Sequence, residues 1–97
     1  MGVKTRLSCG FMVEKSGPRL RANRQQQAAL SRLLHQVRTD AGLSQEALAK
    51  RLAKPQSFVS KYESGARRLD LLELREVCRA MGISVAEFVR RFDKLIG

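Results

Sequence analysis

Two short amphipathic segments with a three-residue break between them lie at the centre of the sequence. Ser44 is placed to cap a first helix over 45–52, whose apolar residues recur at helical spacing. The break, residues 53–55, ends in Pro55, which suits the first turn of a helix but not its interior. A second short helix is therefore expected over 56–63, and the pattern predicts two short helices joined by a tight turn.

The segments on either side predict three further helices, because their apolar residues also follow a helical period. Aromatic residues make up only 5% of the chain and Trp is absent, so the core must be built from aliphatic side chains, which favours packed helices over a sheet. Ser84 and Glu87 have the spacing of a capping box at the start of the last helix. We expect an all-α fold, a compact five-helix bundle over residues 25–97, with helices at 25–41, 45–52, 56–63, 71–81 and 85–95.

Residues 1–24 differ from the rest of the chain in charge and in helix-breaking residues. They contain six lysines and arginines and a single acid, Glu14, and so carry half of the chain's net charge of +10. Gly10, Gly17 and Pro18 are expected to interrupt any long helix there. This segment therefore predicts a flexible basic N-terminal arm that precedes the folded domain.

The excess of basic residues predicts a polyanionic partner, which leaves nucleic acid, an anionic membrane surface and an acidic protein open. No apolar run approaches the ~20 residues of a membrane span, and the first residues lack the apolar stretch of a signal peptide. Cys9, Cys78 and His35 have no partners at metal-ligand spacing, and no catalytic triad or pair of carboxylates is visible. We expect reduced cysteines, no metal or cofactor, and no enzymatic activity.

The second short helix, over 56–63, has a narrow polar outer face. Two short helices with such a turn form a helix-turn-helix, and the major groove of DNA, about 12 Å wide, admits one such helix. The letters GLSQEALA over 42–49 and SKYESG over 60–65, with Val37 and Arg38 before them, resemble the Cro/repressor-type helix-turn-helix family. The resemblance covers about residues 30–92 and implies a lambda-repressor-like fold that binds double-stranded DNA.

The resemblance also implies roles for individual residues. Base edges would be contacted by Gln56, Ser57 and Lys61, because amide and ammonium groups pair with adenine and guanine. A partly buried ion pair between Arg38 and Glu63 would join the first helix to the end of the second short helix. It would either fix the orientation of that helix on DNA or serve only the stability of the fold, and we favour the structural role. Phosphate contacts would come from the start of the first short helix, from the outer face of the second and from the residues after it: Gln45, Ser60, Ser64, Arg67 and Arg68.

Two residues leave the geometry of the turn open, and a third leaves its own contact open. Ala53 stands where the family usually has a glycine of positive φ, which costs on the order of 1 kcal/mol for an alanine. Pro55 replaces the usual Ser or Thr cap. Phe58 would either touch a thymine methyl group or pack on a neighbouring loop, and we favour packing.

These features predict a sequence-specific transcriptional regulator, most simply a repressor, in the bacterial cytoplasm at the nucleoid. An antitoxin that binds both DNA and a toxin is the alternative, with residues 1–24 as the surface for the protein partner, and a bridging coactivator is a third. A homodimer through the last helix is expected, with Phe88, Phe92 and Leu95 at the interface. The competing interpretation of these apolar residues is that they cover the monomer's own core.

Overall fold

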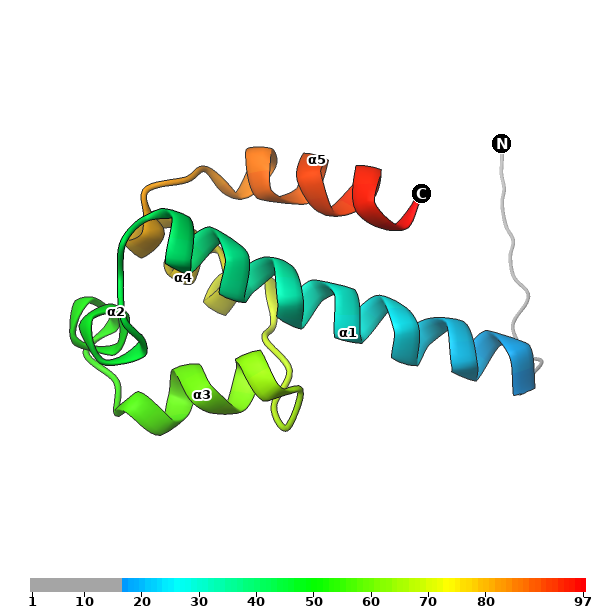
Figure 1. Ribbon diagram of the computed structural model, residues 1–97, viewed down its shortest axis with the longest axis horizontal. Coiled ribbons are helices and arrows are strands. Elements are labelled where there is room, and N and C mark those ends of the chain that lie inside the picture. Colours follow the sequence, from blue (N-terminus) through cyan, green and yellow to red (C-terminus); the bar gives the residue numbers. More distant parts are fainter. Residues whose placement is uncertain (1–16) are drawn as a thin grey trace.

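Five helices make up the part of the chain that the computed structural model describes, residues 17–97, with side chains described from residue 23 onward (Figure 1). No strand occurs within these residues, so the prediction of an all-α fold is confirmed. The helices are α1 (Gly17–Asp40), α2 (Gln45–Leu52), α3 (Gln56–Ser64), α4 (Leu71–Met81) and α5 (Val85–Ile96).

Helix α1 begins at Gly17 and not at residue 25. The predicted start at residue 25 was therefore wrong, and Gly17 and Pro18 lie in the first turn of α1. Proline is favoured there, since the N–H group that it lacks has no partner within the helix. The expected flexibility of residues 1–16 and the state of Cys9 lie outside the described residues.

Side-chain caps fix three of the helix starts. The Ser44 hydroxyl accepts a hydrogen bond from the Ala47 N–H at 3.0 Å, as its position predicts. The Ser84 hydroxyl likewise accepts from the Glu87 N–H, but the Glu87 carboxylate binds Arg90 and Arg91, so the predicted capping box is only half formed. A complete box occurs at α4 instead, between Asp70 and Glu73.

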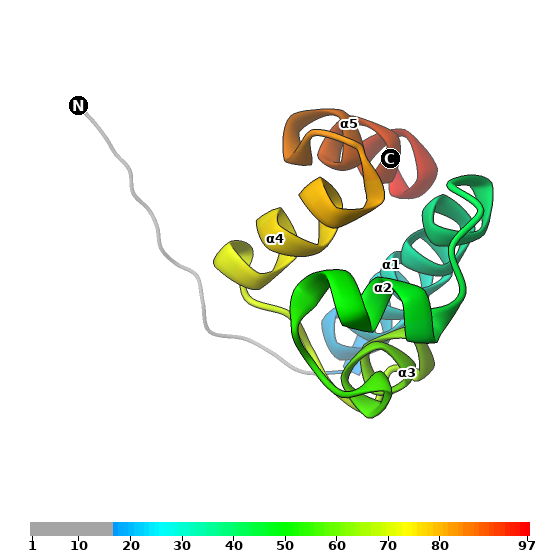
Figure 2. The ribbon, with the colours of Figure 1, turned by 90° about the vertical axis from the view of Figure 1, so that its left-hand side faces the viewer.

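The core lies where all five helices meet. Helix α1 packs on α3 and on α5, and α2 packs on α3 and α4. In Figure 1, α1 runs between α5 on one side and α3 on the other, and in Figure 2 α2 lies between α3 and α4. The most deeply buried large side chains, each at most 2% exposed, are Leu34, Leu48, Val59, Tyr62, Val77, Cys78 and Phe88.

Burial of Phe88 corrects one expectation for the dimer interface. Its side chain is 1% exposed, so it belongs to the core of the monomer, as the competing interpretation held. Leu95 is 58% exposed, and Val89 and Ile96 of the same helix are also exposed. The apolar pattern of α5 therefore serves two surfaces, one inside the core and one on the outside of the molecule.

The structure settles the geometry of the turn between α2 and α3, which the sequence had left open at Ala53 and Pro55. Ala53 adopts φ 56° and ψ 42°, and it is the one residue other than glycine with positive φ in the described part of the chain. Pro55 precedes α3 in an extended conformation and gives no side-chain cap. The backbone N–H of Lys54 closes the turn by donating to the Ala49 carbonyl at 3.0 Å.

Replacing Ala53 with glycine is expected to raise the free energy of unfolding by about 0.5–1 kcal/mol. Glycine relieves the strain of about 1–2 kcal/mol that the left-handed conformation causes in alanine. Glycine also gives the unfolded chain more conformational entropy, which offsets part of this gain in stability. The matched control is Ala28→Gly in the exposed interior of α1, which should lower stability by about 1 kcal/mol. Urea unfolding measures both, and a loss of stability for both variants would contradict the strain at Ala53.

Candidate nucleic-acid interface

The outer face of α3 carries the three side chains predicted to contact bases. Gln56, Ser57 and Lys61 are all exposed, whereas Val59 and Tyr62 on the opposite face are buried. Ser64 continues the exposed face at the end of the helix. The structure therefore presents these polar groups together on one side of a helix whose other side is anchored in the core.

A buried ion pair between α1 and the end of α3 anchors that helix. Arg38 donates to Glu63 through Nε at 2.7 Å and through Nη2 at 3.1 Å. The two side chains are only 8% and 5% exposed. Arg38 also donates through Nη1 to the Leu43 carbonyl at 2.7 Å, which ties the loop before α2 to the same guanidinium. The family resemblance implied this pair and its partial burial, and the structure buries both side chains almost completely.

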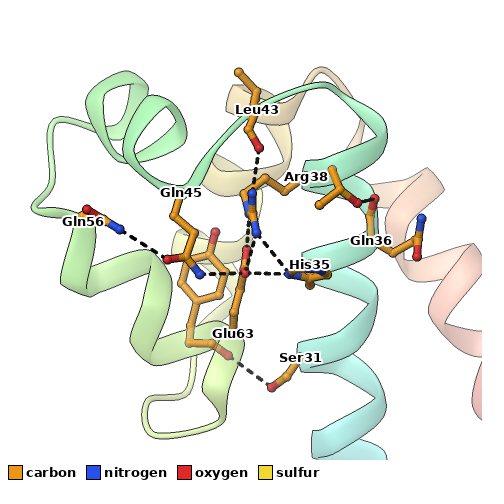
Figure 3. Close-up of polar contacts among 10 residues, drawn as sticks. Ser31, His35, Gln36, Arg38, Leu43, Gln45, Gln56 and Glu63 are labelled. Carbon is orange, nitrogen blue, oxygen red and sulfur yellow. Dashed lines mark hydrogen bonds and ion pairs between the residues drawn. The ribbon is translucent and has the colours of Figure 1, made fainter.

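Further donors converge on the same carboxylate, as Figure 3 shows. Gln45, the first residue of α2, donates through Nε2 to Glu63 Oε1 at 3.1 Å. His35 Nδ1 lies 3.1 Å from that oxygen and 3.1 Å from Arg38 Nη2, so its tautomer decides whether it donates or accepts. One turn earlier in α1, Ser31 donates to the Tyr62 carbonyl at 3.1 Å. Glu63 thus fixes α1, α2 and α3 relative to one another.

The Glu63 carboxylate is ionised at neutral pH. Burial alone raises the pKa of this carboxyl, but hydrogen bonds with Arg38, Gln45 and His35 outweigh it, and the net pKa lies below the ordinary value. The hydrogen bond to Glu63 in turn raises the pKa of Arg38. The anchor of α3 is therefore a charged pair whose charges compensate each other.

Gln45 joins the anchor to the exposed face of α3. Its Oε1 accepts a long hydrogen bond, of 3.5 Å, from Gln56 Nε2 (Figure 3). A residue predicted to contact phosphate and a residue predicted to contact a base therefore lie side by side, at the starts of α2 and α3. Sequence reasoning placed both residues but did not find their contact, or the contacts of Gln45 and His35 with Glu63.

The remaining residues predicted to contact phosphate differ in their surroundings. Ser64 and Arg68 are exposed, and Ser60 is half-buried, with its hydroxyl directed to the Ser57 carbonyl. Arg67 forms two hydrogen bonds with Glu73, at 2.8 and 3.1 Å, and its guanidinium lies 4.8 Å from the centre of the Phe58 ring. The structure thus gives Arg67 an acidic partner within the domain.

Phe58 packs inside the domain. Its ring meets the Tyr62 ring edge-on with 5.6 Å between the centres, and Lys54 and Arg67 lie over it. The Arg67 hydrogen bonds, with a backbone hydrogen bond at Asp70, lower the pKa of Glu73 to about 2. This arrangement agrees with the packing interpretation of Phe58 and leaves the polar residues of α3 as its exposed groups.

The described side chains show no cluster suited to a metal ion, since residues 23–97 bring no three His, Cys, Asp or Glu side chains together. Cys78 is a free thiol in the core, and burial raises its pKa to about 11. Across residues 17–97, none of the helices combines the length and the hydropathy that a membrane span needs.

Comparison with known proteins identifies the domain. The chain matches the helix-turn-helix family model HTH_3 over residues 34–88. An XRE-family like protein from Pseudomonas syringae pv. tomato str. DC3000 is 36% identical, with a TM-score of 0.77 over 82% of this chain and 98% of that chain. No curated protein sequence matches the chain significantly.

Two structures of the clp gene regulator ClgR from Corynebacterium glutamicum are also similar, each with a TM-score of 0.66. One is 27% identical over 73% of this chain and 76% of that chain, and the other is 26% identical over 74% and 92%. The family match covers more than half of the sequence and includes the anchored helix α3. The chain therefore belongs to the Cro/CI-type, XRE family of helix-turn-helix proteins.

Proposed function

We propose that the protein is a sequence-specific DNA-binding transcriptional regulator that inserts α3 into the major groove. The observation that carries the proposal is the exposed polar face of α3, with Gln56, Ser57 and Lys61, held in place by the buried Arg38–Glu63 pair. A rigid helix of this kind positions amide, hydroxyl and ammonium groups for base edges. The two ClgR structures, which belong to a clp gene regulator, support a regulatory role.

Phosphate contacts around α3 would set its register on the duplex. Gln45 lies at the start of α2, where the N–H groups of the first turn and the positive end of the helix dipole favour an anion. Ser60 lies within α3, and Ser64, Arg67 and Arg68 extend this contact surface to the end of α3 and the following loop. A phosphate that approaches Arg67 would compete with Glu73 for the guanidinium.

The regulator would act as a dimer, most simply as a repressor that occupies an operator on the bacterial chromosome. The exposed apolar surface of α5, formed by Val89, Leu95 and Ile96, supports a symmetric interface. Phe92 is half-buried beside it, whereas Phe88 is excluded by its place in the core. Two copies would present their α3 helices to half-sites about 34 Å apart.

Selection of duplexes from a random library tests the proposal directly. We expect the full-length protein to enrich one motif with two-fold symmetry and to bind it with a Kd of about 10⁻⁸ to 10⁻¹¹ M at physiological salt. Log K should fall linearly as log[salt] rises, because phosphate contacts release counterions. Failure to enrich any motif, with binding equally weak for all duplexes, would overturn the proposal.

A further inference from the structure

Helix α1 continues past the last turn of α3 (Figure 1). Residues of the two helices and of the loop after α3 line an open groove of about 480 Å³. The α1 side of the groove contributes Arg24 and Arg32. The other side is formed by the end of α3 and the following loop, with Ser64, Gly65 and Arg68. These arginines come from segments far apart in the sequence, and the fold brings them to one depression.

The groove carries an excess of positive charge. Arg24, Arg32 and Arg68 are exposed, and no carboxylate of residues 23–97 lies within ion-pair distance of them. The one acidic residue in the lining, Glu63, is neutralised by Arg38. In contrast, Arg67, Arg90 and Arg91 all pair with carboxylates of the domain. Guanidinium groups with free N–H donors match the oxygen geometry of a phosphate.

The groove is continuous with the exposed face of α3. Lys61 and Ser64 lie three residues apart on this helix, hence on one face, and Ser64 also lines the groove. A duplex whose major groove receives α3 therefore passes this depression. Arg24 and Arg32 are eight residues apart in α1, about 12 Å along the helix axis. Successive phosphates of one DNA strand are separated by about 3.4 Å along the axis of the duplex, so the two arginines are far enough apart to contact different phosphates.

We propose that this groove binds the DNA backbone beside the base-reading site, with Arg24 and Arg32 contacting two different phosphates and Arg68 contributing from the loop. The inference rests on the proposed function, because it needs a duplex with α3 in its major groove. It adds two contact residues from α1 to those in α2, in α3 and in the following loop. Each neutralised phosphate contributes about 0.9 to the slope of log K against log[salt].

The test compares the variant Arg24→Gln/Arg32→Gln with the control Arg90→Gln/Lys94→Gln. The control removes the same charge from exposed positions of α5, which lies across α1 from α3 (Figure 1). Binding to a duplex with the selected motif is measured by fluorescence anisotropy at several salt concentrations, and circular dichroism checks the fold. We expect the slope to fall by about 1 to 2 for the α1 variant, with the same motif selected, and to change by less than half as much for the control.

Ethylation interference gives a second readout that net charge alone does not change. Ethylation of the phosphates that Arg24 and Arg32 contact should weaken binding of the unaltered protein but not of the α1 variant, whereas phosphates contacted by other residues should interfere with both proteins. Equal slopes for the two variants, or identical interference patterns, would overturn the inference and leave the proposed function intact. The inference also fails if 10 mM inorganic phosphate shifts the amide resonances of Ser64 and Gly65 while the slopes stay equal, since the groove then takes a small anion. Absence of duplex binding by the unaltered protein would overturn both proposals.

Discussion

Replacing Arg38 with methionine is expected to destabilise the protein by about 3–5 kcal/mol, because it leaves the buried Glu63 carboxylate without its charge partner. The Leu43 carbonyl loses its donor in the same substitution. A domain of this size loses roughly 4–8 °C of Tm for each kcal/mol, so the melting temperature should fall by more than about 10 °C. Thermal unfolding followed by circular dichroism measures the change.

Two controls separate the cost of an orphaned charge from the loss of a side chain. Arg90→Met removes an exposed ion pair with Glu87 and should cost less than about 1 kcal/mol. In the double variant Arg38→Met/Glu63→Met no charge is left buried, so stability should recover in part relative to Arg38→Met. If the double variant is the less stable of the two, the buried pair stabilises the fold in its own right and our explanation is wrong.

The second large effect is expected for Gln56→Ala/Lys61→Ala on the exposed face of α3. Each base contact contributes about 1–3 kcal/mol, so affinity for the selected motif should fall by about 30-fold to 10⁴-fold. Binding to unrelated duplexes should change much less, because both side chains are exposed and the fold does not depend on them. Motif selection with the variant should give a different or weaker consensus.

Arg68→Ala is the matched comparison for this recognition variant. It removes a charge from the loop after α3 and should weaken binding to all sequences about equally, while the salt slope falls by about one unit. Thermal unfolding should be unchanged for both proteins. If Arg68→Ala alters the selected motif as strongly as Gln56→Ala/Lys61→Ala does, the assignment of base and phosphate contacts is incorrect.

Local features of this fold could be predicted from the sequence because neighbouring residues determine them. Ser44 caps α2 as predicted, because an N-cap depends on residues next to it in the sequence. The start of α1 could not be located in the same way. A proline such as Pro18 can end a helix or stand in its first turn. The pattern of apolar side chains does not show which of the two applies.

The candidate site was only partly predictable, since its contacts join residues that are distant in the chain. The family resemblance supplied the Arg38–Glu63 pair, and helical spacing supplied the outer face of α3. The meeting of Gln45 with Glu63 depends on how α2 packs across α3, which periodicity does not determine. The partner of Arg67 was missed for a different reason, because Asp70 and Glu73 have the spacing of a capping box that was not recognised.

Helix α1 has a thermodynamic consequence for any ligand that Arg24 contacts. A segment that is disordered before binding loses roughly 1–2 kcal/mol of backbone conformational entropy for each residue that becomes ordered. Arg24 instead lies within a continuous helix that runs from Gly17 to Asp40, and the core of the domain anchors this helix through Leu34 and Val37. Its backbone is already ordered before an anion arrives, so association there requires only the ordering of a side chain.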